Sequence, residues 1–219
     1  MLFQSCLAIA FPVAYFTARY AGKYRGLVLA LLIAPFWISY MMRMLAWINL
    51  LQPDGIVDSV ITLGGVIPLD INWLSGNPFT VVMGLIYGYV PYMLLPLFAA
   101  LDRISPSLLE AGRDLGASGF DLFRRVILPM SLPGVLAGTL LIALPMMGDY
   151  FTSDMLSKSP STAMIGNLIN LSISTPGQTG QAGALLLLVL LVLLVPMVLY
   201  TRSTARADRK STRLNSSHA

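Results

Sequence analysis

The chain has 219 residues, of which 56% are hydrophobic and 11% are charged, and its formal net charge is +4. Soluble domains typically carry about 25% charged residues, so this composition indicates a membrane protein. The single cysteine, Cys6, excludes an internal disulfide, and the single histidine, His218, lies near the C-terminal end, which excludes a catalytic triad and a histidine-based metal site.

Five apolar stretches approach the roughly 20 residues that a spanning helix requires. In chain order they are Leu2–Ala18, Leu27–Leu51, Phe79–Leu101, Leu132–Met147 and Ala182–Tyr200. The fourth can extend towards Phe151. The sequence therefore predicts an all-α fold, a polytopic transmembrane bundle of about five spanning helices.

Basic residues cluster in alternate connections between these stretches, and such connections face the cytoplasm. The connections after the first, third and fifth stretches contain Arg19, Lys23, Arg25, Arg103, Arg113, Arg124, Arg125, Arg202 and Arg206. The other two contain Asp54, Asp58, Asp70, Asp149 and Asp154, with Lys158 as their one basic residue. This alternation predicts that the N-terminus of the chain lies outside and its C-terminus inside. Cations in such clusters indicate membrane topology and not a nucleic-acid-binding face.

The outer connection Gln52–Pro78 is long and rich in glycine, proline and asparagine. It contains Trp73 and apolar residues such as Ile67 and Leu69. Two interpretations stay open, a loop that covers the bundle and a re-entrant or interfacial segment, and the covering loop is slightly favoured.

The inner connection Ser105–Pro129 has the pattern of a short amphipathic helical hairpin. Ser105 and Pro106 suit the start of a helix, and Gly116 suits its stop. A second helix has Ser118 as its cap and Asp121 three residues later. One face of the first helix carries Leu108, Leu109, Gly112 and Leu115, and Glu110 and Arg113 are spaced to pair across one turn. The apolar side of the second helix carries Leu122, Phe123 and Val126, and Pro129 marks its end.

The pattern of this connection resembles the "EAA" loop of ABC importer permeases. It runs Glu110-Ala111-Gly112, then Gly116, then Val126-Ile127-Leu128-Pro129. Gly112 stands where that family has a second alanine, and Val126 where it has isoleucine. The resemblance implies that an ATP-hydrolysing subunit docks on Glu110, Ala111, Gly112, Gly116, Val126, Leu128 and Pro129. The alternative is a structured inner loop without a partner.

Further motifs are similar to those of polyamine (spermidine/putrescine) permeases. They are Ala34-Pro35-Phe36-Trp37-Ile38-Ser39, Arg43, Ala46-Trp47, Leu50-Leu51 and Gly148-Asp149-Tyr150-Phe151. The similarity covers roughly Ala10–Arg202. It implies the permease subunit of a type I importer in a bacterial inner membrane, with ATPase subunits, a second permease subunit and an extracytoplasmic binding protein as partners. Permeases for iron, thiamine and sulfate-type anions share the scaffold and are the alternatives.

Carboxylates and aromatic rings bind protonated amines by charge pairing and cation–π contact. The candidate pathway residues are Asp149, Tyr150, Trp47, Arg43, Tyr40 and Tyr87, with Tyr89 and Tyr92 as further aromatic residues. The alternative for the aromatic residues is an interfacial belt. Arg43 lies inside an apolar run, where a charge usually faces a bundle interior. We interpret it as a gate or structural residue, with Asp149 as its candidate partner.

Two other classes of function are weighed against transport. An intramembrane enzyme needs paired carboxylates, a nucleophile with a base, or metal ligands within helices, and none is evident, so no catalytic residue, metal or cofactor is predicted. The chain has no Gly-rich phosphate loop with Lys and Ser/Thr, so it should not hydrolyse ATP itself. A channel or scaffold that works without ATP is the second alternative.

Both ends of the chain depart from the family pattern. Permeases of this type usually have six helices with the loop between the fourth and fifth, whereas here it lies between the third and fourth, so the first helix is expected to be missing. The segment 208–219 resembles the translation of a DNA-sequencing adapter. We therefore expect a permease domain at 1–207, incomplete at its N-terminus, followed by a disordered tail at 208–219.

Overall fold

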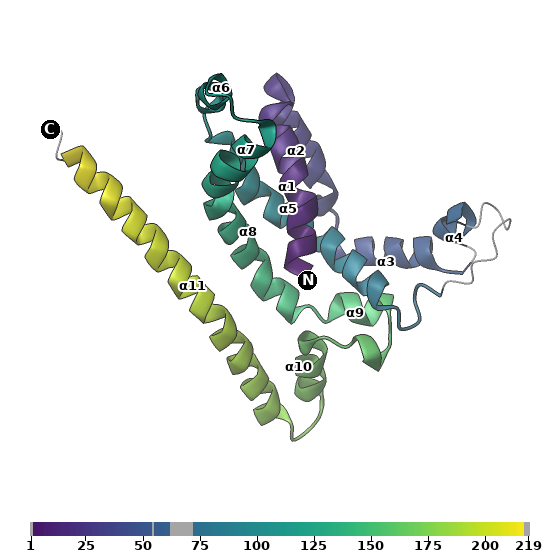
Figure 1. The fold of residues 1–219 in the computed structure, drawn as a ribbon. Coiled ribbons are helices and arrows are strands. Elements are labelled where there is room, and N and C mark those ends of the chain that lie inside the picture. The colour runs from purple at the N-terminus through teal and green to yellow at the C-terminus, as the bar shows by residue number, and fades with distance from the viewer. Residues whose placement is uncertain (1, 54, 62–71, 217–219) are drawn as a thin grey trace. The chain divides into compact units, whose positions relative to one another are not determined.

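The computed structural model describes residues 2–53, 55–61 and 72–216, and over these residues the chain forms helices and no strand (Figure 1). Asp54, Ile67, Leu69 and Asp70 lie outside the described residues. The chain divides into two compact units, Met1–Leu168 and Ile169–Ala219. The all-α fold predicted from the sequence is confirmed. Within the described residues, four helices, or five if a bent pair counts as one span, are long and apolar enough to cross a membrane.

Three long helices form the core of the first unit. These are α1 (Leu2–Arg19), α5 (Pro78–Asp102) and α8 (Leu128–Gly148), and both α1 and α8 pack against α5. Small residues permit this close packing: a Cβ at Gly134 of α8 would lie 2.5 Å from the Ala100 Cβ and 2.7 Å from the Pro96 carbonyl oxygen of α5. Such contacts are typical of helices that associate in a membrane.

The second predicted span, Leu27–Leu51, is not one straight helix. After the short η1 (Gly22–Tyr24), it divides into α2 (Arg25–Ile33), η2 (Ala34–Trp37) and α3 (Tyr40–Leu51), with a bend of 85° before α3. Pro35 lacks an N–H and its ring disfavours a continuing helix, and Ile38 and Ser39 then adopt extended backbone (ψ 137° and 140°). α4 (Ile56–Ile61) follows α3.

The fourth span also ends earlier than its predicted extension. α8 stops at Gly148, Asp149 has extended backbone (ψ 111°), and a separate helix α9 (Phe151–Leu156) follows. The extension towards Phe151 is therefore wrong. η4 (Pro160–Thr162) and α10 (Ile165–Ser174) come next, and Gly166 allows α10 to approach the end of α8, since a Cβ there would lie 2.5 Å from the Gly148 carbonyl oxygen.

The inner connection forms the helical hairpin that its sequence predicts. α6 (Pro106–Asp114) ends in a turn at Gly116, whose φ of +82° favours glycine. α7 (Gly119–Leu122) begins with Ser118, whose Oγ accepts a hydrogen bond from the Asp121 N–H (3.1 Å). Ser105 has the backbone conformation of a cap, but its side chain accepts no hydrogen bond from an α6 N–H.

Two details of this hairpin correct the prediction. Pro129 does not end the second helix, because α7 continues through a π-helical segment, η3 (Phe123–Ile127), into α8. The wider turn at η3 accommodates the Pro129 ring and its missing N–H. In addition, none of the ion pairs among the described residues joins Glu110 to Arg113.

The second unit contains α11 (Thr179–Ser216), whose apolar part, Thr179–Val198, confirms the fifth predicted span. The helix is assigned as far as Ser216, and the separate tail at 208–219 stays a prediction.

Candidate functional site

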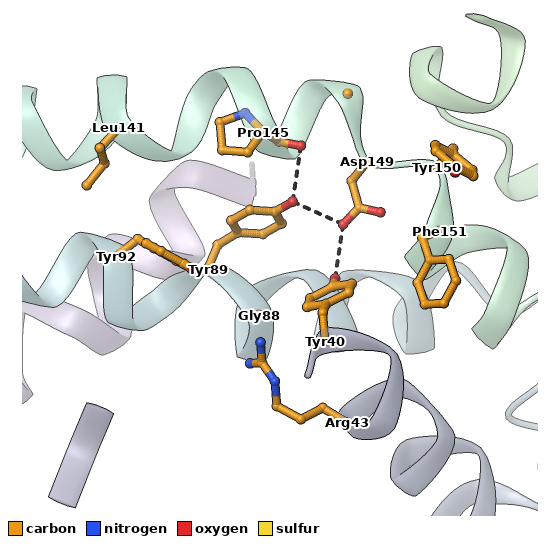
Figure 2. A pocket seen from close by; sticks show the side chains of 11 residues that line it. Tyr40, Arg43, Gly88, Tyr89, Tyr92, Leu141, Pro145, Asp149, Tyr150 and Phe151 are labelled. Atoms are coloured by element: carbon orange, nitrogen blue, oxygen red, sulfur yellow. Dashed lines mark hydrogen bonds between the residues drawn. The ribbon is translucent and has the colours of Figure 1, made fainter. Parts of the chain in front are cut away.

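A pocket of about 490 Å³ lies in the first unit, where α3, α5, the end of α8 and the start of α9 meet (Figure 2). Breaks in two predicted spans bring these elements together, since α3 begins after the 85° bend and α9 begins after α8 stops. The pocket is lined by Tyr40, Arg43, Gly88, Tyr89, Tyr92, Leu141, Pro145, Gly148, Asp149, Tyr150 and Phe151.

Asp149 is the polar centre of the pocket. Its side chain is buried, and its carboxylate accepts hydrogen bonds from three residues on three helices. Oδ2 accepts from the hydroxyls of Tyr40 (3.0 Å), Tyr89 (3.1 Å) and Thr152 (2.7 Å), and Oδ1 accepts from the Thr152 N–H (2.9 Å). Hydrogen bonds to a charged acceptor are stronger than neutral ones, so this arrangement suits a buried carboxylate anion.

The two tyrosine hydroxyls are shared with other acceptors. The Tyr89 hydroxyl also lies 3.1 Å from the Pro145 carbonyl oxygen in the last turn of α8, and the Tyr40 hydroxyl also contacts the Thr152 hydroxyl. Each hydroxyl has one proton to donate, so these bonds to Asp149 can be exchanged without leaving the tyrosines unpaired.

Gly88 of α5 determines where the Tyr40 ring can lie. A Cβ at this position would be 3.0 Å from Tyr40 Cε2 and 3.2 Å from the Tyr40 hydroxyl oxygen. The absence of a side chain at Gly88 therefore lets Tyr40 reach from α3 to Asp149.

Arg43 lines the same pocket but is not the partner of Asp149 that the sequence suggests. Its side chain is 7% exposed, and its Cζ lies 4.3 Å from the ring centroid of Phe36, 5.2 Å from that of Tyr40 and 5.9 Å from that of Tyr87. Figure 2 shows Tyr40 between Arg43 and Asp149. The ring of Tyr40 contacts the cation while its hydroxyl contacts the anion, so the predicted Arg43–Asp149 pair is wrong.

Four of the six predicted pathway residues line the pocket: Asp149, Tyr150, Arg43 and Tyr40. Tyr87 and Trp47 do not line it; Tyr87 contacts Arg43, and Trp47 packs edge-on against Tyr87 with 5.6 Å between ring centroids. The sequence interpretation omitted Gly88 and Thr152, and it named Phe36 in a family-like motif without a role in the pathway. The spacing Asp149-x-x-Thr152 resembles a helix cap and could have identified Thr152.

A second, smaller pocket of about 360 Å³ lies on the α6–α7 hairpin. It is lined by Gly112, Leu115, Gly116, Ala117, Asp121, Leu122, Arg125 and Val126. Of the predicted docking residues, Gly112, Gly116 and Val126 line it, and Glu110 and Ala111 are exposed beside it on α6. Leu128 and Pro129 lie in the first turn of α8 and do not line it.

Large apolar side chains are exposed at this surface. Leu115 is 89% exposed and Phe120 is 70% exposed. Packing explains the glycine at position 112. A Cβ at Gly112 would lie 2.5 Å from Leu122 Cδ2, so the absence of a side chain allows α6 and α7 to approach each other. Large exposed apolar side chains beside a groove are typical of a protein-binding surface.

Comparison with known proteins identifies relatives over most of the chain. The family described as "Binding-protein-dependent transport system inner membrane component" matches residues 10–210. The "Spermidine/putrescine transport system permease protein PotB" of Haemophilus influenzae is 38% identical over 164 residues, which are 75% of this chain and 57% of that protein. PotB of Escherichia coli is 37% identical over 167 residues, 76% of this chain and 60% of that protein.

The "Inner membrane ABC transporter permease protein YdcU" of Escherichia coli is 34% identical over 172 residues, 74% of this chain and 54% of that protein. The chain thus spans less than two thirds of the length of these curated relatives. A solved bacterial ABC transporter "involved in the import of the acidic polysaccharide alginate" matches with a TM-score of 0.69 at 20% identity, over 94% of this chain and 76% of that chain. That likeness concerns the fold alone.

We predict that Thr152→Val weakens the fold, because it removes a buried hydroxyl that donates to Asp149 and leaves the carboxylate less satisfied. The expected loss is about 1–2 kcal/mol in the free energy of unfolding, measured by chemical denaturation in detergent. Thr139→Val is the matched control, since the Thr139 hydroxyl donates only to the Val135 carbonyl of its own helix. Equal losses in the two variants would contradict a special role for the Asp149 network.

Proposed function

Because the chain belongs to the family of binding-protein-dependent transport system inner membrane components, we propose that it is the permease subunit of an ATP-driven importer of polyamines such as spermidine and putrescine. Its membership of this family and its apolar helices make it a multi-pass inner-membrane protein. The observation that carries the substrate class is the buried Asp149 carboxylate in a pocket lined by tyrosines. Carboxylates and ring faces bind protonated amines on a methylene chain.

The proposed assembly has partners on both sides of the membrane. An extracytoplasmic binding protein delivers the polyamine, a second permease subunit completes the pathway, and two ATPase subunits dock on hairpins such as α6–α7. The ATPase subunits hydrolyse the ATP, and this chain does not. Support for the docking comes from the bare Leu115 and Phe120 beside the hairpin groove.

A continuous helical run supports mechanical coupling between the two sites. The run Gly119–Met147 has 29 residues and is thus about 43 Å long, since an α-helix rises about 1.5 Å per residue. It begins in the docking hairpin and ends beside Asp149 in the pocket. Closure of the ATPase pair can therefore tilt this run and change access to the pocket.

The proposed topology has the N-terminus of the chain outside, with the α6–α7 hairpin and the C-terminus in the cytoplasm. Contacts between two basic connections support it: Arg25 Nη1 lies 2.8 Å from Asp102 Oδ1, and Arg19 Nη2 donates to the Leu101 carbonyl (3.0 Å). The α1–α2 connection and the end of α5 are therefore at the same end of the bundle, as the positive-inside rule requires.

We predict that Asp149→Asn lowers spermidine uptake at least tenfold, because the amide keeps the volume and loses the charge that attracts an ammonium group. The measurement is uptake of radiolabelled spermidine by cells that express the full-length permease with its partners. Asp154→Asn is the control, since Asp154 is exposed and bonds to Asn167 outside the pocket. Competition by sulfate, thiamine or an iron complex, with none by putrescine, would instead favour another solute.

We predict that Leu115→Asp prevents co-purification of the ATPase with the permease and leaves the permease monodisperse, because Leu115 is 89% exposed and the described fold buries little of it. Ser107→Asp, an exposed change on α6 of the same hairpin, should retain the ATPase. Retention of the ATPase by Leu115→Asp would contradict docking at Leu115. Failure of the wild-type permease to recover any ATPase would favour the channel or scaffold that works without ATP.

We predict opposite labelling of two engineered cysteines in a Cys6→Ser background. A membrane-impermeant maleimide added to intact spheroplasts should label Ser161→Cys after α9 and should label Ser107→Cys on α6 only after permeabilisation. The reverse pattern would invert the proposed topology.

A further inference from the structure

The guanidinium of Arg43 occupies a cluster of aromatic rings formed by Phe36, Tyr40 and Tyr87. The centroid distances of 4.3, 5.2 and 5.9 Å are those of cation–π contacts. Ring clusters of this kind also bind alkylammonium ions, because the attraction depends on the positive charge and not on the chemical group that carries it. The cluster is therefore a site for a cation, and a side chain of the same protein fills it.

Arg43 is held there by few polar contacts. Its Nε and Nη1 are buried and have no hydrogen-bond partner among the described residues, and the residue as a whole is only 7% exposed. The ion pairs among the described residues, Arg25–Asp102 and Arg125–Asp121, do not include it. A buried guanidinium usually has a carboxylate or carbonyl partner, because burial without one is costly. Displacement of Arg43 from the rings therefore breaks no hydrogen bond at Nε or Nη1.

The ring cluster adjoins the pocket that contains Asp149. Tyr40 and Arg43 line this pocket, and Phe36 and Tyr87 contact Arg43 without lining it. Tyr40 belongs to both, since its ring contacts the guanidinium and its hydroxyl donates to the Asp149 carboxylate. Two positive groups joined by a short apolar chain could thus occupy the two faces of this arrangement, one beside the carboxylate and one on the rings. The pocket of about 490 Å³ also has room for the displaced Arg43 side chain.

We propose that Phe36, Tyr40 and Tyr87 form a second cation subsite next to the pocket, for an alkylammonium group, and that Arg43 is its tethered occupant, which a substrate amine displaces. This proposal rests on the proposed function. It makes Arg43 a residue that sets affinity and specificity: its competition disfavours a monoamine, whereas a diamine or triamine held at Asp149 has a second amine close to the rings. Removal of Arg43 should consequently improve substrate binding.

The test is equilibrium binding of radiolabelled spermidine to the full-length permease, purified in complex with its partner subunits in nanodiscs. Arg43→Gln should lower the Kd about tenfold, which corresponds to about 1.4 kcal/mol, because the rings become vacant. Arg43→Lys should keep the wild-type Kd, since an ammonium can fill the same rings. Arg43→Met carries the same expected gain as Arg43→Gln and replaces it if that variant is not monodisperse.

A second pair of variants separates the ring site from a simple loss of positive charge. Phe36→Leu removes the nearest ring, so Arg43→Gln should give no gain in the Phe36→Leu background. A tenfold gain that persists there overturns the ring subsite, because the effect would then come from charge at a distance. An unchanged or weaker Kd in both Arg43→Gln and Arg43→Met also overturns it.

The outcomes distinguish this proposal from the proposed function. If the wild-type complex binds and transports spermidine and the Arg43 variants show no gain, the ring subsite is wrong and polyamine import stands. If the wild-type complex binds sulfate, thiamine or an iron complex and no spermidine, polyamine import and the alkylammonium subsite both fail.

Discussion

The burial of the Asp149 carboxylate is the constraint on which the arrangement of the first unit depends. A carboxylate in a helix bundle requires donors, and continuous helices cannot provide them from their own backbone, because their N–H groups are already bonded. Two helix interruptions solve this problem. The bend before α3 brings the Tyr40 hydroxyl towards Asp149, and the stop of α8 at Gly148 frees the Thr152 N–H at the start of α9. The two helix interruptions therefore supply the donors that the buried Asp149 carboxylate requires.

The same interruptions define what can move. α8 is continuous with the α6–α7 hairpin through η3, so a displacement at the hairpin reaches Gly148 through one helical run, and beyond Gly148 the connection consists of the hydrogen bonds around Asp149. Hydrogen bonds from neutral hydroxyls can be exchanged for others at small net cost, whereas the packing of α5 against α8 at Gly134 leaves no room for adjustment. The helix core thus transmits motion and the Asp149 network is the part that can rearrange.

Much of this architecture could be predicted from the sequence, for identifiable reasons. Long apolar runs and clustered cations indicate the spans directly. Gly116 and Ser118 indicate the hairpin, because their local conformations depend little on the rest of the fold. Asp149 could be identified because a carboxylate beside an apolar run is costly unless it is used. The bend at Pro35 was harder to predict, since proline also occurs inside α5 and α8 without ending them. The roles of Gly88 and Phe36 could not be identified, because they depend on Tyr40 and Arg43 reaching them from another element.

Under the proposed function, the separation of Arg43 from Asp149 favours binding of a substrate amine. A direct buried pair between them would satisfy both charges, and breaking such a pair typically costs about 3–5 kcal/mol, so a substrate amine would compete poorly for the carboxylate. Here the donors to Asp149 are uncharged hydroxyls and an N–H, and hydrogen bonds of that kind typically contribute about 1.5–3 kcal/mol each when one partner is charged. An ammonium ion needs to replace a tyrosine hydroxyl and not a guanidinium. Tyr40 keeps the cation and the anion apart, and so leaves the carboxylate stable within the bundle and accessible to a stronger donor.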